Sequence, residues 1–167
     1  LRADLQKQDS LFNQVMRESV ERWITLAEDR LRGSGIQCYI SPGNDDSFEI
    51  DAVLSRSSYV INPEGQVVKL GGSYEMATLG FTNMTPWKCP RDIPEEELAG
   101  KVEAITSSVG EFRKCIFNFH CPPIDTIIDQ APKLDATLKP IMSGGRLEMI
   151  GAGSTAVRDA VEKHQPL

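Results

Sequence analysis

One run of residues, Ile36-Gln37-Cys38-Tyr39-Ile40-Ser41-Pro42-Gly43-Asn44-Asp45-Asp46, indicates the fold class. Its first five residues have the composition of a strand, and a polar turn containing Pro42 and Gly43 follows them. A long helix is predicted before this strand, over residues 5–31, because apolar side chains recur there every three or four residues. These side chains are Phe12, Met16, Val20, Trp23, Ala27 and Leu31. A helix, a short strand and a polar turn in this order are typical of α/β proteins.

The rest of the chain continues the alternation of helices and strands. Turns at Pro63-Glu64-Gly65 and Gly71-Gly72 separate three strands that are predicted to form a meander. The expected elements are, in chain order, a short helix at 48–56, strands at 58–62, 66–70 and 73–82, a helix from Pro94 to about Ser108, a strand at Cys115–Phe119, a loop with weak helical character at 124–140, a strand at 147–150 and a helix at 154–164. We therefore expect an α/β fold with a mixed sheet.

Composition and charge narrow the function classes. The 167 residues suffice for one domain, and no apolar run approaches the roughly 18 residues of a membrane span. The 18 Lys and Arg against 24 Asp and Glu give a net charge of −6, which argues against a nucleic-acid groove. This charge still allows a small phosphorylated substrate when a metal ion supplies positive charge. The four cysteines show no Cys-x-x-Cys spacing, so we expect reduced core residues in a cytoplasmic protein.

Asn44 and His120 stand out because each follows the end of an apolar strand. Loops at strand ends carry ligand sites in layered α/β proteins, and an amide oxygen with an imidazole nitrogen suits Mn, Fe or Zn. Residue types alone leave two simpler interpretations open: Gly43-Asn44 as an ordinary turn and His120 as a structural histidine. Trp87 is equally open, since it either lines a substrate cleft or covers a sheet edge.

Three segments resemble the calcineurin-like metallophosphoesterases. Pro42-Gly43-Asn44-Asp45-Asp46 is similar to the Gly-Asn-His-Asp/Glu motif of that family, and Ile116-Phe117-Asn118-Phe119-His120 before Cys121-Pro122-Pro123 is similar to its later strand with a terminal metal-binding histidine. Residues 153–167 are similar to the helix and strand entry that precede its Gly-His-x-His motif in one prokaryotic branch. The order and approximate spacing agree over most of the chain.

The resemblance implies an α/β/β/α sandwich with mixed sheets, of which residues 1–167 form an incomplete part. It further implies a metal-dependent hydrolase, in which a metal-bound hydroxide at a dinuclear centre of Mn, Fe or Zn cleaves a phosphodiester or small phosphorylated compound. Asn44 and His120 would be metal ligands, and Asp46 would orient the loop. Asp45 occupies the position of the family's catalytic histidine, as a candidate catalytic residue or as a turn residue.

Two departures from the family pattern favour an alternative to an active enzyme. Asp45 replaces a histidine that protonates the leaving group, and a carboxyl group does so only if its pKa is well raised. The Asp-x-His, Gly-Asp and Gly-His-x-His motifs are absent, and His120 and His164 are the only histidines, so two metal ions would be incompletely coordinated. We therefore expect an internal fragment that is nearly inactive alone. The alternative is a non-catalytic binding or scaffold module that retains the phosphoesterase fold.

Overall fold

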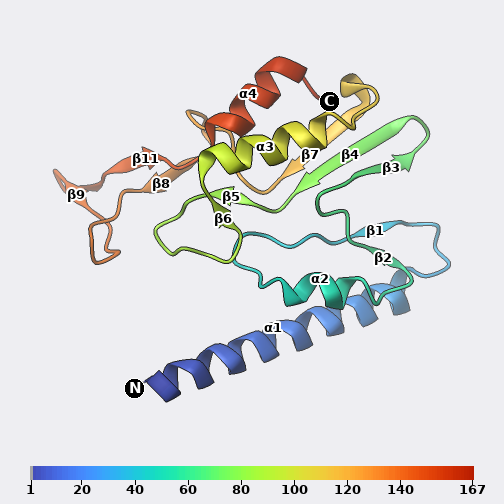
Figure 1. Cartoon of the computed structure of the whole chain (residues 1–167), viewed down its shortest axis with the longest axis horizontal. Coiled ribbons are helices and arrows are strands. Elements are labelled where there is room, and N and C mark those ends of the chain that lie inside the picture. The colour runs from blue at the N-terminus through green and yellow to red at the C-terminus, as the bar shows by residue number, and fades with distance from the viewer. Residues whose placement is uncertain (1) are drawn as a thin grey trace.

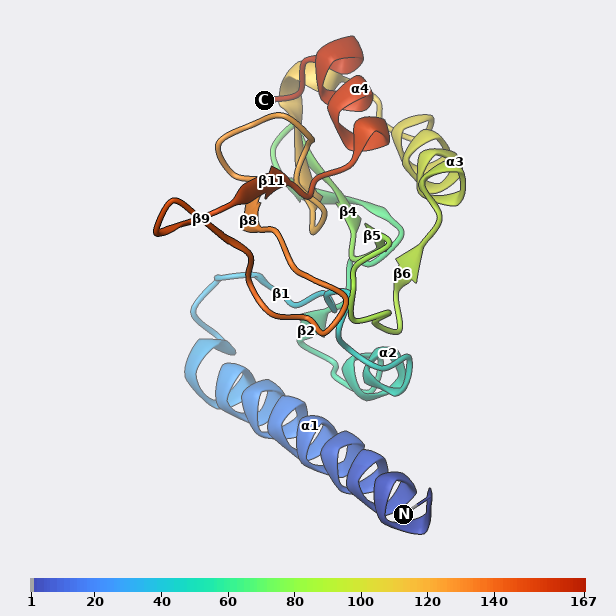
Figure 2. The ribbon, with the colours of Figure 1, turned by 90° about the vertical axis from the view of Figure 1, so that its left-hand side faces the viewer.

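Two pairs of helices enclose the strands in the computed structural model, which describes residues 2–167 (Figures 1 and 2). The helices are α1 (Arg2–Leu31), α2 (Glu49–Leu54), α3 (Glu95–Thr106) and α4 (Thr155–His164), with a short 3-10 turn η1 (Phe112–Lys114). In both views α1 and α2 lie on one side of the strands and α3 and α4 on the other. The chain therefore has the layered α/β architecture expected from its sequence.

The main sheet is mixed and contains β3 (Val67–Gly71), β4 (Tyr74–Leu79) and β7 (Cys115–Phe119). β3 pairs antiparallel with β4, and β4 pairs parallel with β7 in the register Glu75↔Cys115 to Leu79↔Phe119. Two parallel pairs accompany it: β1 (Cys38–Tyr39) with β2 (Val60–Ile61), and β5 (Thr82–Asn83) with β6 (Asp92–Ile93). A projecting hairpin arm, residues 130–151, contains β8 (Gln130–Pro132), β9 (Met142–Ser143), β10 (Arg146–Leu147) and β11 (Met149–Gly151), which pair antiparallel as β8 with β11 and β9 with β10.

Each helical layer covers its own hydrophobic core. Leu98 and Val102 of α3 pack with Leu79 of β4 and with the buried face of α4, and a fully buried leucine side chain stabilises the fold by about 2 kcal/mol. The other core lies between α1, α2 and β2, and its buried side chains are Val20, Ile24, Ile50, Val53, Leu54 and Val60. The two layers are therefore stabilised separately, and the segments between them are held by polar contacts described below.

The starts of α3 and α4 are tied together by one carboxylate. Ser154 caps α4, with its hydroxyl accepting from Val157 N at 3.2 Å, as its residue type predicts. Glu95 Oε1 in the first turn of α3 accepts from Ser154 Oγ at 2.6 Å and from Ala156 N at 2.8 Å. The negative charge of Glu95 thus lies at the positive ends of both helices.

The structure corrects several details of the predicted elements. The meander is wrong at its start, because β2 pairs with β1 rather than with β3. The strand expected at 36–40 contains only Cys38–Tyr39, and the segment 124–140 contains β8 instead of helical structure. The strand expected at 147–150 is divided between β10 and β11. These segments form isolated two-strand pairs, in which tertiary contacts rather than local propensity decide the conformation.

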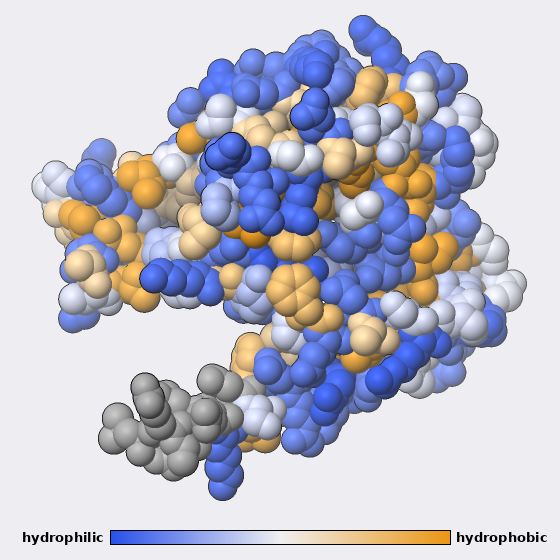
Figure 3. Space-filling view, viewed as in Figure 1, coloured by the Kyte–Doolittle hydropathy of each residue, from blue (hydrophilic) through white to orange (hydrophobic). Residues whose placement is uncertain are grey.

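Apolar side chains gather on the surface of the hairpin arm, at the left of Figure 3. The exposed ones there include Met142, Leu147, Met149 and Ile150. Over the described residues 2–167, no helix combines the length and the apolar character that crossing a bilayer demands.

Candidate functional site

The loops after β1 and β7 bring Asn44 and His120 together. The Nε2 atom of His120 lies 3.1 Å from the Oδ1 atom of Asn44, although 76 positions separate them in sequence. The backbone of His120 continues the pairing of β7 with β4, donating from its N–H to Leu79 O at 2.8 Å. The backbone oxygen of Asn44 accepts from Arg91 N at 3.0 Å. Both side chains are therefore placed by backbone contacts to neighbouring elements.

Gly43 allows the imidazole to lie directly against the loop. A Cβ atom at this position would lie 2.8 Å from Cε1 and 2.9 Å from Nε2 of His120, closer than packed atoms approach. The turn around Gly43 is held by Asp46, whose Oδ2 accepts from Gly43 N at 2.7 Å. Asp46 therefore orients the loop that carries Asn44.

Asp92 fixes the orientation of the Asn44 amide. Its Oδ1 accepts from Asn44 Nδ2 at 2.9 Å and from Thr82 Oγ1 at 3.1 Å, so the amide oxygen of Asn44 is left facing His120. Its Oδ2 accepts from the N–H and the hydroxyl of Thr85 and from Cys89 N. Partial burial opposes ionisation of Asp92, but these hydrogen bonds outweigh it and hold the pKa of the carboxyl below its ordinary value.

Arg91 holds the same loop from the other side. Its buried guanidinium donates to Asp46 O at 3.2 Å and to Asp51 Oδ2 at 2.6 Å. It also lies over the ring of Phe48, 4.6 Å from the centroid. Arg91 and Asp92 thus clamp the loop 43–48 through its backbone and through the Asn44 side chain.

Asp45 and Cys121 lie beside the pair without joining it. Asp45 is exposed, and its carboxylate lies near the Cys89 thiol, whose pKa is raised by burial and by the charges of Asp92 and Asp45. Cys121 is buried with its thiol donating to Asn83 Oδ1 at 3.2 Å, whereas His120 is exposed and directed at Asn44. Cys121 and His120 are neighbours in the chain, but their side chains contact different residues.

The spacing of Asn44 and His120 fits two ligands of one cation. Ligands about 2.1 Å from a common cation lie about 3.0 Å apart at a right angle and about 3.4 Å apart at a tetrahedral angle. The observed 3.1 Å lies within this range, and it is equally the length of a direct hydrogen bond between the imidazole N–H and the amide oxygen. Within residues 2–167, however, no group of three or more His, Cys, Asp or Glu side chains is arranged to hold a metal. The donor set fits a cation in type and spacing, but it supplies only two ligands.

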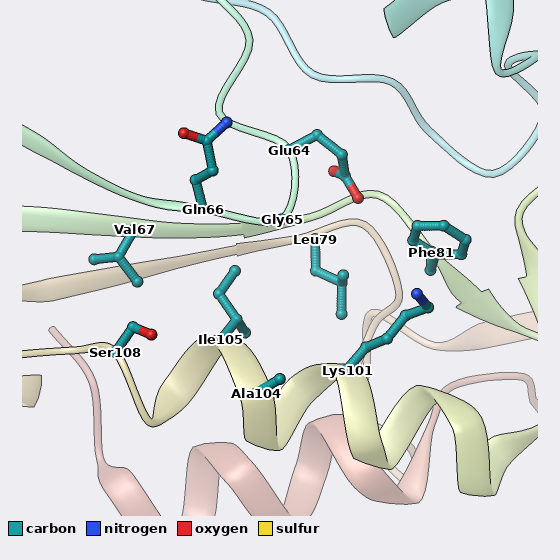
Figure 4. A pocket seen from close by; sticks show the side chains of 10 residues that line it. All are labelled: Glu64, Gly65, Gln66, Val67, Leu79, Phe81, Lys101, Ala104, Ile105 and Ser108. Carbon is teal, nitrogen blue, oxygen red and sulfur yellow. The ribbon is translucent and has the colours of Figure 1, made fainter.

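Glu64 lines a cavity of about 540 Å³ next to Gly80 (Figure 4). Its Oε2 accepts from Gly80 N at 2.7 Å, while Oε1 is buried without a hydrogen-bond partner among the residues that the structure describes. Burial raises the pKa of this carboxyl. Lys101 reaches from α3 toward Phe81 in the same cavity, with its Nζ 4.3 Å from the ring centroid. Gly80 in turn packs against the carbonyl of Pro42, where the Asn44 loop begins.

Sequence reasoning missed the residues that position the pair. Asp92, Arg91 and Glu64 lie in segments whose composition predicts a loop or turn. Nothing in their spacing indicates a role at the site. Their roles follow from contacts with residues at least 16 positions away.

Comparison with known proteins shows a fold and no family. No model of a known protein family matches this chain, and no curated protein sequence matches it. A protein of known crystal structure superposes on 92% of this chain with a TM-score of 0.57 and 13% sequence identity. The superposition covers 56% of that protein, so the chain spans little more than half its length. At this identity the likeness shows that the chain shares an α/β fold with a longer protein.

Proposed function

We propose that Asn44 and His120 bind a divalent cation at the active site of a metallophosphoesterase, which cleaves a phosphodiester or a small phosphorylated compound. The observation that carries the proposal is the 3.1 Å distance between an amide oxygen and an imidazole nitrogen at two strand ends. In this proposal, residues 1–167 form part of an α/β/β/α sandwich. The remaining ligands come from the longer polypeptide, because two ligands alone bind a cation weakly.

The surrounding residues have defined tasks in the proposed site. Bound divalent cations would activate water and screen the negative charge of the phosphate. Asn44 and His120 bind, Asp46 holds the turn at Gly43, and Asp92 keeps the Asn44 oxygen directed at the cation position. Asp45 follows Asn44 on the same loop and remains the candidate catalytic residue, although its carboxylate lies near the Cys89 thiol in this structure.

The test measures Mn²⁺-dependent hydrolysis of bis(4-nitrophenyl) phosphate by the full-length protein. Asn44→Ala and His120→Ala should each lower kcat/KM at least a hundredfold, because each removes a ligand. His164→Ala is the matched control: His164 is the other histidine, it stacks on Phe112, and its replacement should leave hydrolysis unchanged. Equal activity of all three variants and the unaltered protein would refute the proposal.

A second candidate, a non-catalytic binding module with the same fold, rests on the two-ligand donor set and on Asp45 in place of a histidine. It predicts Mn²⁺ binding that depends on Asn44 and His120, measured by the loss of the free Mn²⁺ electron paramagnetic resonance signal, without hydrolysis. The two measurements together separate the candidates.

A further inference from the structure

A second cavity, of about 410 Å³, lies between the loop after β5 and the hairpin arm. Its walls are mainly apolar and include Met84, Pro86, Trp87, Ile124, Leu134 and Ile150. Lys133 is the one charged side chain in the lining, and its ammonium is paired with Glu148. The cavity therefore suits an uncharged group better than a phosphate.

Trp87 is presented to this cavity on a tight turn. Lys88 N donates to Thr85 O at 3.2 Å, with Pro86 at the second position of the turn, where its fixed backbone angle is favourable. Lys88 closes the turn at a φ of 54°. Trp87 is 63% exposed and also lines the cavity, so aromatic surface is available for stacking.

The turn and the proposed metal ligands share one anchor. Asp92 Oδ2 holds Thr85 and Cys89, on either side of Trp87, while Oδ1 holds the Asn44 side chain. Asn83, at the start of the same lining segment, accepts from the thiol of Cys121, the neighbour of His120. The cavity is thus adjacent to the Asn44–His120 pair and fixed relative to it.

From this arrangement we infer that the cavity binds the nucleobase of a nucleoside phosphoester, stacked on Trp87, while its phosphate lies at Asn44 and His120. The inference rests on the proposed function for the position of the phosphate. The volume of about 410 Å³ has room for a purine or a pyrimidine base. Stacking on an exposed indole accepts different bases, since every base presents a planar face.

The test measures quenching of Trp87 fluorescence by AMP, with ribose 5-phosphate and phenyl phosphate as comparison ligands, in EDTA. The Trp23→Phe background isolates the emission of Trp87, because Trp23 is the only other tryptophan. Calorimetry of Trp87→Ala should show about tenfold weaker AMP binding, with most of the affinity retained in Trp87→Phe. Trp23→Ala is the matched control, since this side chain is similarly exposed, at 59%, but lies on α1.

The inference is overturned if ribose 5-phosphate or phenyl phosphate binds as tightly as AMP, or if Trp87→Ala binds AMP normally. Because the measurement excludes metal, it is independent of hydrolysis. Trp87-dependent AMP binding in a protein that hydrolyses no phosphoester would support this inference and refute the proposed function. Hydrolysis without Trp87-dependent AMP binding would support the proposed function and refute this inference.

Discussion

The carboxylate of Asp92 determines which atom of Asn44 faces the proposed metal position. An asparagine amide presents an oxygen on one side and two N–H donors on the other, and only the oxygen binds a cation. Because the carboxylate of Asp92 only accepts hydrogen bonds, the donor side of Asn44 is held toward it and the oxygen toward His120.

Asp92→Asn should therefore weaken Mn²⁺ binding by the full-length protein about tenfold. The new amide keeps its oxygen on the Thr85 and Cys89 N–H groups, so its own NH₂ faces Asn44 and favours turning the Asn44 amide over. Electron paramagnetic resonance of free Mn²⁺ measures the change. Asp129→Asn is the control, because Asp129 is a buried carboxylate that also accepts backbone N–H bonds but lies near β8. Unchanged Mn²⁺ affinity in Asp92→Asn would contradict this account of the Asn44 orientation.

The same substitution has a defined pH dependence. Since the pKa of Asp92 is lower in the folded chain than its ordinary value, its ionised form stabilises the fold. This contribution is complete above the ordinary carboxyl pKa of about 3.9 and is lost as the pH falls through the lower, folded value. Urea unfolding from pH 7 to pH 2.5 should show the stability difference between Asp92→Asn and the unaltered protein shrinking at the acid end. A constant difference would assign the effect to packing alone.

The strand-end positions and the family resemblance marked Asn44, His120 and Asp46, but nothing in the sequence marked Asp92 or Arg91. Asn44 and His120 were identifiable because a strand followed by a turn has a local signature, and the structure brings their side chains together. Asp92 and Arg91 act on residues 48 and 40 positions away, and no local pattern records such contacts. The positioning groups of a site built from several loops therefore become visible only in three dimensions.

At the scale of elements, Gly80, the residue after β4, determines how closely the Asn44 loop approaches the main sheet. A Cβ atom on Gly80 would lie 2.2 Å from the carbonyl oxygen of Pro42, a backbone atom that cannot turn aside. The Gly80 N–H is also held by Glu64. The missing side chain of Gly80 thus fixes the distance between the two segments that carry the site.

Gly80→Ala should lower the free energy of unfolding by about 2 kcal/mol, because the added methyl group overpacks a buried contact with backbone. Gly100→Ala is the matched control within α3, where a Cβ atom meets nothing within 4 Å. This second substitution should raise stability by about 1 kcal/mol, since alanine favours the helix. Urea unfolding monitored by circular dichroism measures both. Equal effects of the two substitutions would contradict the close contact at Pro42.

The success of prediction also differs between kinds of element. The long helices and β7 were predicted closely because their periodic or apolar patterns extend over five or more residues. The two-residue strands carry too little pattern, and the parallel pairing of β1 with β2 depends on the helix packed across them. The predicted meander was wrong at its first strand for this reason.

At the scale of the whole molecule, the candidate site lies between the α1–α2 layer and the α3–α4 layer. Asn44 leaves β1 on one side, and His120 leaves β7 on the other. Since each layer has a separate hydrophobic core, polar groups carry much of the connection at this point. Arg91 is the largest of them: it precedes β6 and pairs with Asp51 of α2.

Removing this connection should therefore loosen the site as well as the fold. Arg91→Ala should lower the free energy of unfolding by about 3 kcal/mol, because it leaves Asp51 and the backbone oxygen of Asp46 without their buried partner. Arg56→Ala, which breaks a similar but exposed pair with Glu21, should cost less than about 1 kcal/mol. Hydrogen exchange gives the decisive comparison: in Arg91→Ala, protection should fall first at Asp46, whose N–H is bonded to Gly43, while amides inside α1 and α3 keep theirs. Uniform loss across both layers would mean that the two cores unfold as one unit and that Arg91 does not connect separate halves.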